Sequence, residues 1–199
     1  MTLLRDIGAV AIGASAGGIQ ALSVLLPALP AKAAVAVFIV VHLPRDRPSL
    51  LAEVFIRKCR LDVREARDKE PVIDGTVYFA PANYHLLVDH GPQLALSADG
   101  LVHYSRPSID VLFESAAEVY GNRLMGIILT GANEDGAQGL AAVHDAGGIT
   151  VVQTPELAQS PQMVTSAIKI RQPDYVLSLD KIAAMLTALP TATAARRPS

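Results

Sequence analysis

The sequence predicts an α/β fold, namely a doubly wound, mainly parallel sheet with helices on both faces and a small antiparallel hairpin element. Short apolar runs alternate along the chain with segments whose apolar residues recur at helical spacing. The runs are apolar at nearly every position, which is typical of parallel strands buried on both faces. Only the middle of the chain departs from this alternation, with short segments separated by turn residues.

The first four elements are expected to form two strand–helix units. A strand over residues 7–12 is followed by a helix over 17–29 that stops before a proline. A β-branched strand over 35–41 and a helix over 48–57 complete the second unit. Strands connected in this way run parallel, with right-handed crossovers.

The middle of the chain predicts small strands, and the second half returns to the alternation. A hairpin is expected from Leu86 to Leu96, and Ser108 is expected to cap the helix that follows it. The expected short strands are 61–66, 76–80, 84–88 and 93–97, and the later elements are a helix over 109–119, a strand over 124–129, a helix over 136–145, strands over 149–152 and 175–177, and a helix over 180–188. Residues 1–189 are thus predicted to form one domain, followed by a disordered tail over 190–199.

Composition and charge exclude several classes of protein. The 199 residues carry 17 basic and 19 acidic side chains, a formal charge of −2, which provides no basic face for nucleic acid. The longest apolar run, residues 33–41, is too short for an integral membrane protein, and the N-terminus is not a secretory signal. With one cysteine the chain forms no internal disulfide, so we expect a cytoplasmic protein.

Three polar side chains follow strands of the predicted sheet. Ser15 comes after the first strand, His42 after the second, and Asp135 after the strand over 124–129. Because the carboxyl ends of parallel strands meet at one edge of a sheet, we expect these residues to lie close together. They are the set needed for a hydroxyl nucleophile, a general base and a group that orients the base.

Each of these residues also has a structural alternative. An isolated His42 is more simply a helix-cap or core histidine, and Asp135 could cap the helix over 136–145, alone or while orienting the base. Glu134 is the rival orienting group. The convergence of a serine, a histidine and an acid at one edge favours the catalytic interpretation.

The glycine-rich loop around Ser15 has two interpretations. A dinucleotide-binding loop needs glycine where Ser15 stands and an acidic residue where His42 stands. A nucleophile elbow needs a serine flanked by small residues, which Gly13 through Gly17 provide, and the next helix N-terminus offers N–H groups to a negative charge. The sequence therefore favours the elbow and predicts no cofactor.

The remaining polar residues are weaker candidates. No metal is expected, because metal-ligand spacing is missing among the other histidines, which are His85, His90, His103 and His144. Cys59 lies between Lys58 and Arg60 but lacks a histidine partner, so it is interpreted as an incidental thiol. Arg45 and Arg106 are candidates for binding an acidic substrate, with a solvated loop and a helix start as their respective alternatives.

Five motifs then occur in order along the chain. They are Gly13-Ala14-Ser15-Ala16-Gly17-Gly18, Val41-His42-Leu43-Pro44, Pro81-Ala82-Asn83-Tyr84-His85-Leu86, Arg106-Pro107-Ser108-Ile109-Asp110, and Thr130-Gly131 through Asp135-Gly136. Together they resemble the catalytic domain of CheB, the chemoreceptor protein-glutamate methylesterase, over residues 9–186 or so.

The resemblance implies a doubly wound α/β domain distinct from the α/β-hydrolase fold. It also implies hydrolysis of glutamate methyl esters on the cytoplasmic helices of methyl-accepting chemoreceptors, with release of methanol, and deamidation of particular receptor glutamines. Its nucleophile falls on Ser15, its base on His42 and its orienting acid on Asp135. The backbone N–H groups expected to stabilise the oxyanion are those of Ala132, Ala16 and Gly17.

The chain departs from the family pattern at three places. Ala16 replaces a threonine or serine, which removes a hydroxyl near the base. Ala132 and Asn133 replace a Met-Gly pair in the loop before Asp135, and Met163-Val164 replaces a Met-Pro pair before a helix, so we expect altered loops around the substrate. Family members commonly carry an N-terminal phosphorylation-regulated receiver domain, whereas this sequence starts at the catalytic strand. It is expected to be either a stand-alone catalytic domain or a piece of a longer protein.

Two alternative functions stay open on the sequence. One is a related esterase or amidase of the same mechanism acting on another protein or a small ester, which the changes at 132–133 and 163–164 favour. The other is a non-enzymatic binding module, either for a nucleotide or as a scaffold. The intact serine, histidine and aspartate argue against the binding module.

Overall fold

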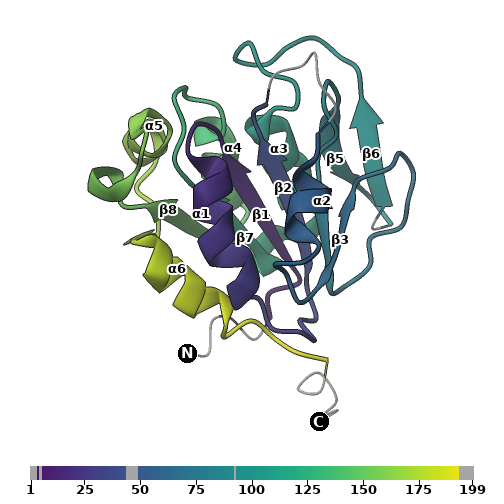
Figure 1. Ribbon diagram of the computed structural model, residues 1–199. Helices are drawn as coiled ribbons and strands as arrows, with labels where there is room; N and C mark the ends of the chain where they lie inside the picture. The colour runs from purple at the N-terminus through teal and green to yellow at the C-terminus, as the bar shows by residue number, and fades with distance from the viewer. Residues whose placement is uncertain (1–3, 5, 44–48, 92, 193–199) are drawn as a thin grey trace.

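The computed structural model describes residues 4, 6–43, 49–91 and 93–192. In this part of the chain, parallel strands form a sheet in the order β3-β4-β2-β1-β7-β8-β9, and β5 and β6 form a separate antiparallel hairpin (Figure 1). The strands of the sheet are β1 (Ala9–Ala14), β2 (Ala36–Val41), β3 (Asp62–Glu65), β4 (Thr76–Phe79), β7 (Leu124–Ile128), β8 (Ile149–Gln153) and β9 (Tyr175–Leu177). The strand order reverses between β1 and β7, which is where ligand sites form in doubly wound sheets.

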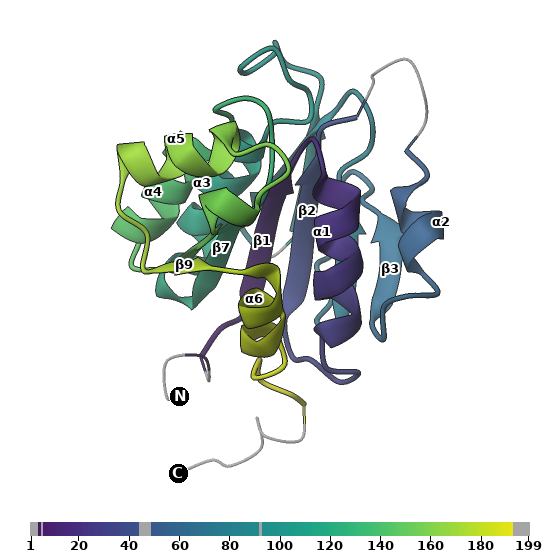
Figure 2. The ribbon, with the colours of Figure 1, turned by 60° about the vertical axis from the view of Figure 1, so that its left-hand side comes forward.

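Helices cover both faces of the sheet (Figure 2). One face packs against α1 (Gly18–Leu25), α2 (Leu51–Phe55) and α6 (Leu179–Leu186). The other packs against α3 (Ile109–Tyr120), α4 (Ala137–Asp145), α5 (Gln162–Ile170) and the hairpin of β5 (His85–Asp89) and β6 (Gln93–Ser97). Strands β1 and β2 are buried along their whole length because each contributes to both apolar clusters.

The predicted fold class and hairpin are confirmed, and the ends of several elements differ. The hairpin pairs Leu86 with Leu96, as expected. The expected helix over 17–29 is α1 followed by a 3₁₀ turn, η1 (Leu26–Ala28), where Pro27 supplies no N–H for an α-helical bond. The short segments that became β3 and β4 run parallel to β2 and extend the main sheet.

The segment between residues 153 and 174 contains a helix that the periodicity did not predict. This helix, α5, follows a 3₁₀ turn, η3 (Pro155–Leu157), and buries Met163, Val164 and Ala167. The N–H of Met163 donates to the carbonyl of Gly131 at 3.0 Å. Helix α5 therefore supports the loop after β7, in which Asp135 lies.

Part of the predicted tail contacts the domain. Among residues 190–192, the Pro190 carbonyl accepts from the N–H of Ala34 at 2.8 Å, and the N–H of Ala192 donates to Lys32 at 3.0 Å. Residues 193–199 of that predicted tail lie outside the described residues. In the described segments no helix combines the length and apolar character needed to cross a bilayer.

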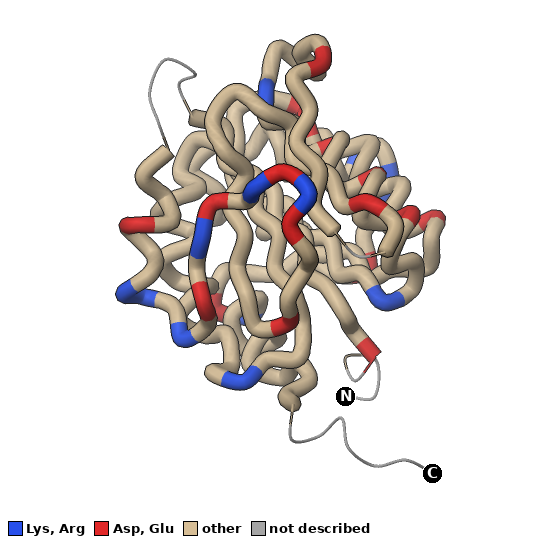
Figure 3. Tube along the Cα trace, turned by 90° about the vertical axis from the view of Figure 1, so that its right-hand side faces the viewer, with Lys and Arg blue, Asp and Glu red and all other residues tan. Residues whose placement is uncertain are grey.

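Charged side chains on the β3 side of the molecule are mixed in sign (Figure 3). Arg64 pairs with Asp62 and Glu70, and Lys69 lies 3.9 Å from Asp89. The described residues on this side thus gather into no basic patch of the kind that binds nucleic acid.

Candidate active site

Ser15, His42 and Asp135 follow three adjacent strands at the carboxyl end of the sheet. Residues Ala14 of β1 and Val41 of β2 are paired, so Ser15 and His42 leave neighbouring strands at the same level. The N–H of Ser15 donates to Thr130 at 2.9 Å, which ties it to the loop after β7 on its other side. The predicted residues therefore lie around the point where the strand order reverses.

The imidazole of His42 is joined to the carboxylate of Asp135. Nε2 of His42 lies 2.8 Å from Oδ2 of Asp135, with side chains that are 13% and 0% exposed, respectively. Burial alone would raise the pKa of Asp135, but the hydrogen bond from His42 and the N–H groups of Ile109 and Asp110 outweigh it, and the pKa is lowered. An ionised Asp135 fixes the proton of a neutral His42 on Nε2 and leaves Nδ1 as the proton acceptor.

Asp135 caps α3 rather than its own helix. Helix α4 begins after Gly136, which has a left-handed conformation (φ 96°) and, as a glycine, no side chain to cap the helix. Instead Asp135 accepts from the N–H groups of Ile109 at 2.7 Å and Asp110 at 3.1 Å. The hydroxyl of Ser108, which is the predicted N-cap of α3, also donates to Asp135 at 2.8 Å. The alternative expectation was that Asp135 caps the helix over 136–145, but it caps α3, a helix that lies earlier in the sequence.

The rival acid, Glu134, contacts His103, whereas the carboxylate that bonds His42 is that of Asp135. Its carboxylate is 67% exposed and lies 3.3 Å from Nδ1 of His103. The other ring nitrogen of His103 lies 3.3 Å from Asp110, a buried carboxylate that accepts from the N–H of Gly139 at 2.6 Å. Burial and the neighbouring charge of Asp135 raise the pKa of Asp110 to about 6, although the Gly139 N–H opposes the shift.

Ser15 lies on a tight, partly exposed turn between β1 and α1. Gly17 at its end has φ 82°, a conformation that side chains other than glycine adopt at a cost. A Cβ on Gly131 of the facing loop would lie 3.0 Å from Cβ of Ser15 and 2.5 Å from Cε of Met163. Glycine at 131 is therefore what lets the two loops approach. In the described residues no hydrogen bond joins the hydroxyl of Ser15 to His42.

The expected oxyanion donors lie on these same two loops. The hydroxyl of Thr130 donates to the carbonyl of Ala16 at 2.8 Å, which holds the turn in place. The N–H groups of Ala16, Gly17 and Ala132 donate to no other described residue. They are thus available to a ligand, as an oxyanion site requires.

Beside Ala132 a groove of about 560 Å³ runs along α5. Its lining includes the polar residues Gln159, Gln162, Thr165 and Lys169. A smaller hollow of about 360 Å³, next to His103 and Glu134, shares Lys169 with it. The groove thus reaches the loop after β7 at Ala132, whereas Asp135 on the same loop is buried.

Asn133 lies against His42, a contact that the sequence did not predict. Its Nδ2 lies 3.4 Å from Nδ1 of His42 and 3.4 Å from Oγ of Ser105. From the sequence, Asn133 was expected only to change the shape of its loop. Its contact with His42 could not be predicted, because side-chain contacts between loops distant in sequence leave no periodic pattern in the chain.

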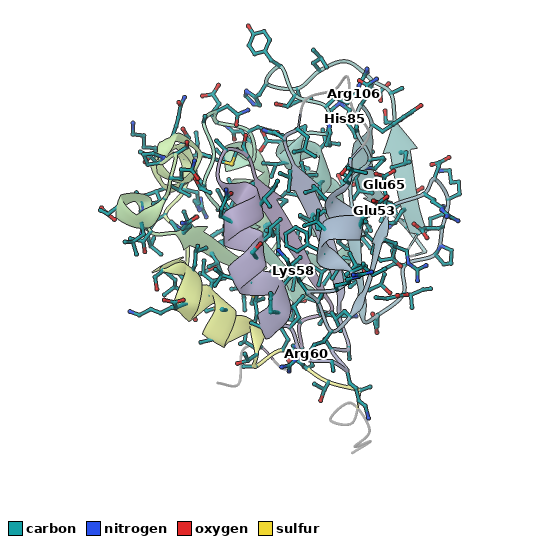
Figure 4. The ribbon with its side chains drawn as sticks, in the orientation of Figure 1. Glu53, Lys58, Arg60, Glu65, His85 and Arg106 are labelled. Carbon is teal, nitrogen blue, oxygen red and sulfur yellow. The ribbon has the colours of Figure 1, made fainter. Side chains whose placement is uncertain are left out.

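Arg106 makes contacts with the hairpin region, and its expected role in substrate binding stays a prediction. Its guanidinium donates to Oδ1 of Asn83 at 3.1 and 2.8 Å and to the carbonyls of Ala98 at 2.5 Å and Asp99 at 2.7 Å. The nearby His85 is buried, accepts from the N–H of Ser108 at 3.1 Å and contacts the Gly100 carbonyl at 3.0 Å (Figure 4). Arg106 therefore fastens the hairpin region, and Arg45 lies outside the described residues.

Cys59 is not activated by its basic neighbours. Burial raises the pKa of its thiol, and hydrogen bonds from the Leu61 and Arg60 backbone only partly offset this. Lys58 extends over the Phe55 ring, with Nζ 5.7 Å from the ring centroid (Figure 4). Among the described residues no group of three or more His, Cys, Asp or Glu could hold a metal ion.

Comparisons with known proteins agree with this geometry. The model of the CheB methylesterase family matches residues 10–186. A "putative protein-glutamate methylesterase/protein-glutamine glutaminase" of Leptospira interrogans is 45% identical over 181 residues, covering 91% of this chain and 94% of that protein. A "protein-glutamate methylesterase/protein-glutamine glutaminase 1" of Chromobacterium violaceum is 43% identical over 183 residues, covering 90% of this chain but 51% of that longer protein.

A solved structure shares the fold. The crystal structure of the Thermotoga maritima CheB methylesterase catalytic domain superposes with a TM-score of 0.85 at 32% sequence identity. The match covers 91% of this chain and 97% of that one. It confirms the predicted doubly wound α/β class with its small antiparallel element.

Proposed function

Because the chain belongs to the CheB methylesterase family, we propose that it removes methyl esters from glutamate residues of chemoreceptors through Ser15, His42 and Asp135. The observation that carries the mechanism is the hydrogen bond between the part-buried His42 and the buried Asp135, on loops that follow the two strands flanking β1, after which Ser15 lies. The names of the relatives support a methyl ester of a protein glutamate as the substrate class. The partners are the cytoplasmic helices of methyl-accepting receptors, and the reaction takes place in the cytoplasm.

Acylation begins at Nδ1 of His42, since Nε2 faces Asp135. Nδ1 takes the proton of the Ser15 hydroxyl while Oγ attacks the ester carbonyl. Asp135 stabilises the resulting imidazolium, and the N–H groups of Ala16, Gly17 and Ala132 face the oxyanion. Each such donor contributes roughly 3–4 kcal/mol to the transition state. The C–OCH₃ bond then breaks, and Nδ1 returns the proton to the methoxy oxygen.

Deacylation repeats these steps with water as the nucleophile. His42 takes a proton from water, the hydroxide attacks the acyl-enzyme, and Ser15 leaves with that proton. The products are a glutamate carboxylate and methanol. The same steps on a receptor glutamine release ammonia, in line with the second activity in the relatives' names.

The test is methanol release from methyl-labelled chemoreceptor membranes, comparing the wild type with Ser15→Ala. We expect release to fall at least about 10⁴-fold, because loss of the nucleophile removes the triad as a unit. Ser23→Ala is the matched control, since Ser23 only donates to Ile19 within α1 at 2.8 Å. That variant should keep the wild-type rate.

The alternatives predict different results. Hydrolysis of simple esters with no methanol from receptors points to an esterase for another substrate. Full activity in Ser15→Ala removes Ser15 from the mechanism. Nucleotide binding without hydrolysis of any ester supports a binding module instead.

A further inference from the structure

The amide of Asn133 is held weakly at the one nitrogen of His42 that is free to accept a proton. Its Nδ2 makes two long contacts, 3.4 Å to Nδ1 of His42 and 3.4 Å to Oγ of Ser105. Its Oδ1 is buried and has no hydrogen-bond partner among the described residues. No second bond locks the carbonyl end, so the amide can pivot in its place.

The donors around Asp135 fix which end of the Asn133 amide faces His42. Asp135 accepts from Nε2 of His42, from the Ser108 hydroxyl and from the N–H groups of Ile109 and Asp110. A carboxylate surrounded by donors is an acceptor only, so Nε2 of His42 carries the proton and Nδ1 carries a lone pair. The end of Asn133 that faces Nδ1 is therefore an N–H donor.

This donor lies where the leaving group is protonated. In the proposed mechanism, on which this inference rests, Nδ1 takes the proton of Ser15 and returns it to the leaving atom. When the Ser15 hydroxyl approaches Nδ1, it displaces the long contact from Asn133. The released N–H then remains next to Nδ1, within reach of the leaving atom.

We propose that Asn133 is a specificity-determining residue that favours methyl esters over glutamine amides at this site. In the tetrahedral intermediate of an ester, the methoxy oxygen has two lone pairs, so it accepts from both His42 and Asn133. In the intermediate of an amide, the nitrogen has one lone pair, which His42 needs, and its own N–H groups face the N–H of Asn133. The extra donor therefore stabilises departure of methanol and opposes departure of ammonia.

The experiment measures both products with one set of enzymes. Chemoreceptor membranes carry either glutamate methyl ester or glutamine at the same receptor position, and the rates of methanol and ammonia release are compared as a ratio. Asn133→Ala removes the amide, and Asn133→Leu removes its hydrogen bonds at similar size. Asn122→Ala is the matched control, because Asn122 is exposed at the opposite end of β7. Partial misfolding of a variant cancels in the ratio.

We expect the ester-to-amide ratio to fall about fivefold to tenfold in both Asn133 variants, the effect of one hydrogen bond, and to stay unchanged in Asn122→Ala. A ratio within about twofold of the wild type in both variants overturns the proposal, since one hydrogen bond moves it further. Failure of the proposed function is seen separately, as product release that persists in Ser15→Ala. A wild type that releases neither product overturns both proposals.

Discussion

Asp135 and Ser15 lie on loops that leave adjacent strands, β7 and β1, yet their surroundings differ. Asp135 is fully buried, and each of its oxygens accepts two hydrogen bonds. Ser15 is partly exposed on a turn that leaves several N–H groups without protein partners in the described part of the chain. The hydrogen bonds around Asp135 are thus all made without substrate, whereas these N–H groups near Ser15 await a bond to the substrate.

This difference separates stability from catalysis. The bonds to Asp135 join α3, β2 and the β7 loop, so the group that orients His42 also holds the fold together. The hydroxyl of Ser15 supports no comparable network. The fold can thus fix the orientation of His42 without blocking access of the substrate to Ser15, because different loops carry these two functions.

Asp135→Asn should have the largest combined effect, because it lowers both turnover and stability. An amide offers NH₂ where the carboxylate accepts from His42 and Ile109, so donors face donors, and His42 is turned to the wrong tautomer. We expect kcat to fall about 10⁴-fold. The free energy of unfolding should fall by about 1–3 kcal/mol, as measured by urea denaturation.

Ser15→Ala provides the comparison for this variant. It should unfold within about 0.5 kcal/mol of the wild type, because a loop serine contributes little packing. Equal loss of stability in Asp135→Asn and Ser15→Ala would show that the two sides are not built differently. Wild-type turnover in Asp135→Asn would remove the acid from the mechanism.

Asp110 sharpens the contrast, because it lies next to Asp135 and its pKa shifts in the opposite direction. Burial and the charge of Asp135 raise the pKa of Asp110 from 3.8 to about 6. The folded state therefore binds the proton more tightly than the unfolded chain, and this contribution to stability is lost as the pH rises through about 6. For Asp135, whose pKa is lowered, the contribution is lost as the pH falls below its ordinary value of 3.8.

Asp110→Asn isolates this titration, because the amide oxygen still accepts from Gly139. From about pH 4 to about pH 7, the free energy of unfolding of the wild type should fall relative to the variant by on the order of 2 kcal/mol. The neighbouring groups Glu114, His103 and Asp135 are present in both proteins. Parallel pH profiles for the two proteins would show that folding does not raise the pKa of Asp110.

The sequence predicted the parts of this site that depend on strand order. Apolar runs located β1, β2 and β7, and the residues after them were therefore placed at one edge of the sheet. The family and the enzyme class inferred from five motifs are confirmed. These features are encoded locally, in runs and short loops.

What the sequence did not predict depends on long-range contacts. Helix α5 was not among the elements predicted from periodicity, although it is as long as α4 and its residues Met163 and Val164 are fully buried. Its place against the loop after β7 depends on the bond from the N–H of Met163 to Gly131, 32 positions away. The capping of α3 by Asp135 joins residues 25 or more positions apart, as does the contact of Asn133 with His42. No local pattern marks such partners.

Arg106→Ala should have the smallest effect and decides what that residue does. Its guanidinium binds Asn83, Ala98 and Asp99, so its loss should loosen the hairpin region, lowering Tm by about 2–4 °C while leaving KM within about twofold. Arg60→Ala, the same change at an exposed position at the end of the α2 region, should alter neither quantity. The opposite pattern, a KM raised about tenfold at an unchanged Tm, would show that Arg106 contacts the substrate. In that case the substrate-binding part of the site would include the hairpin region as well as the Ser15 loop, and the contrast between the Asp135 loop and the Ser15 loop would no longer describe the whole site.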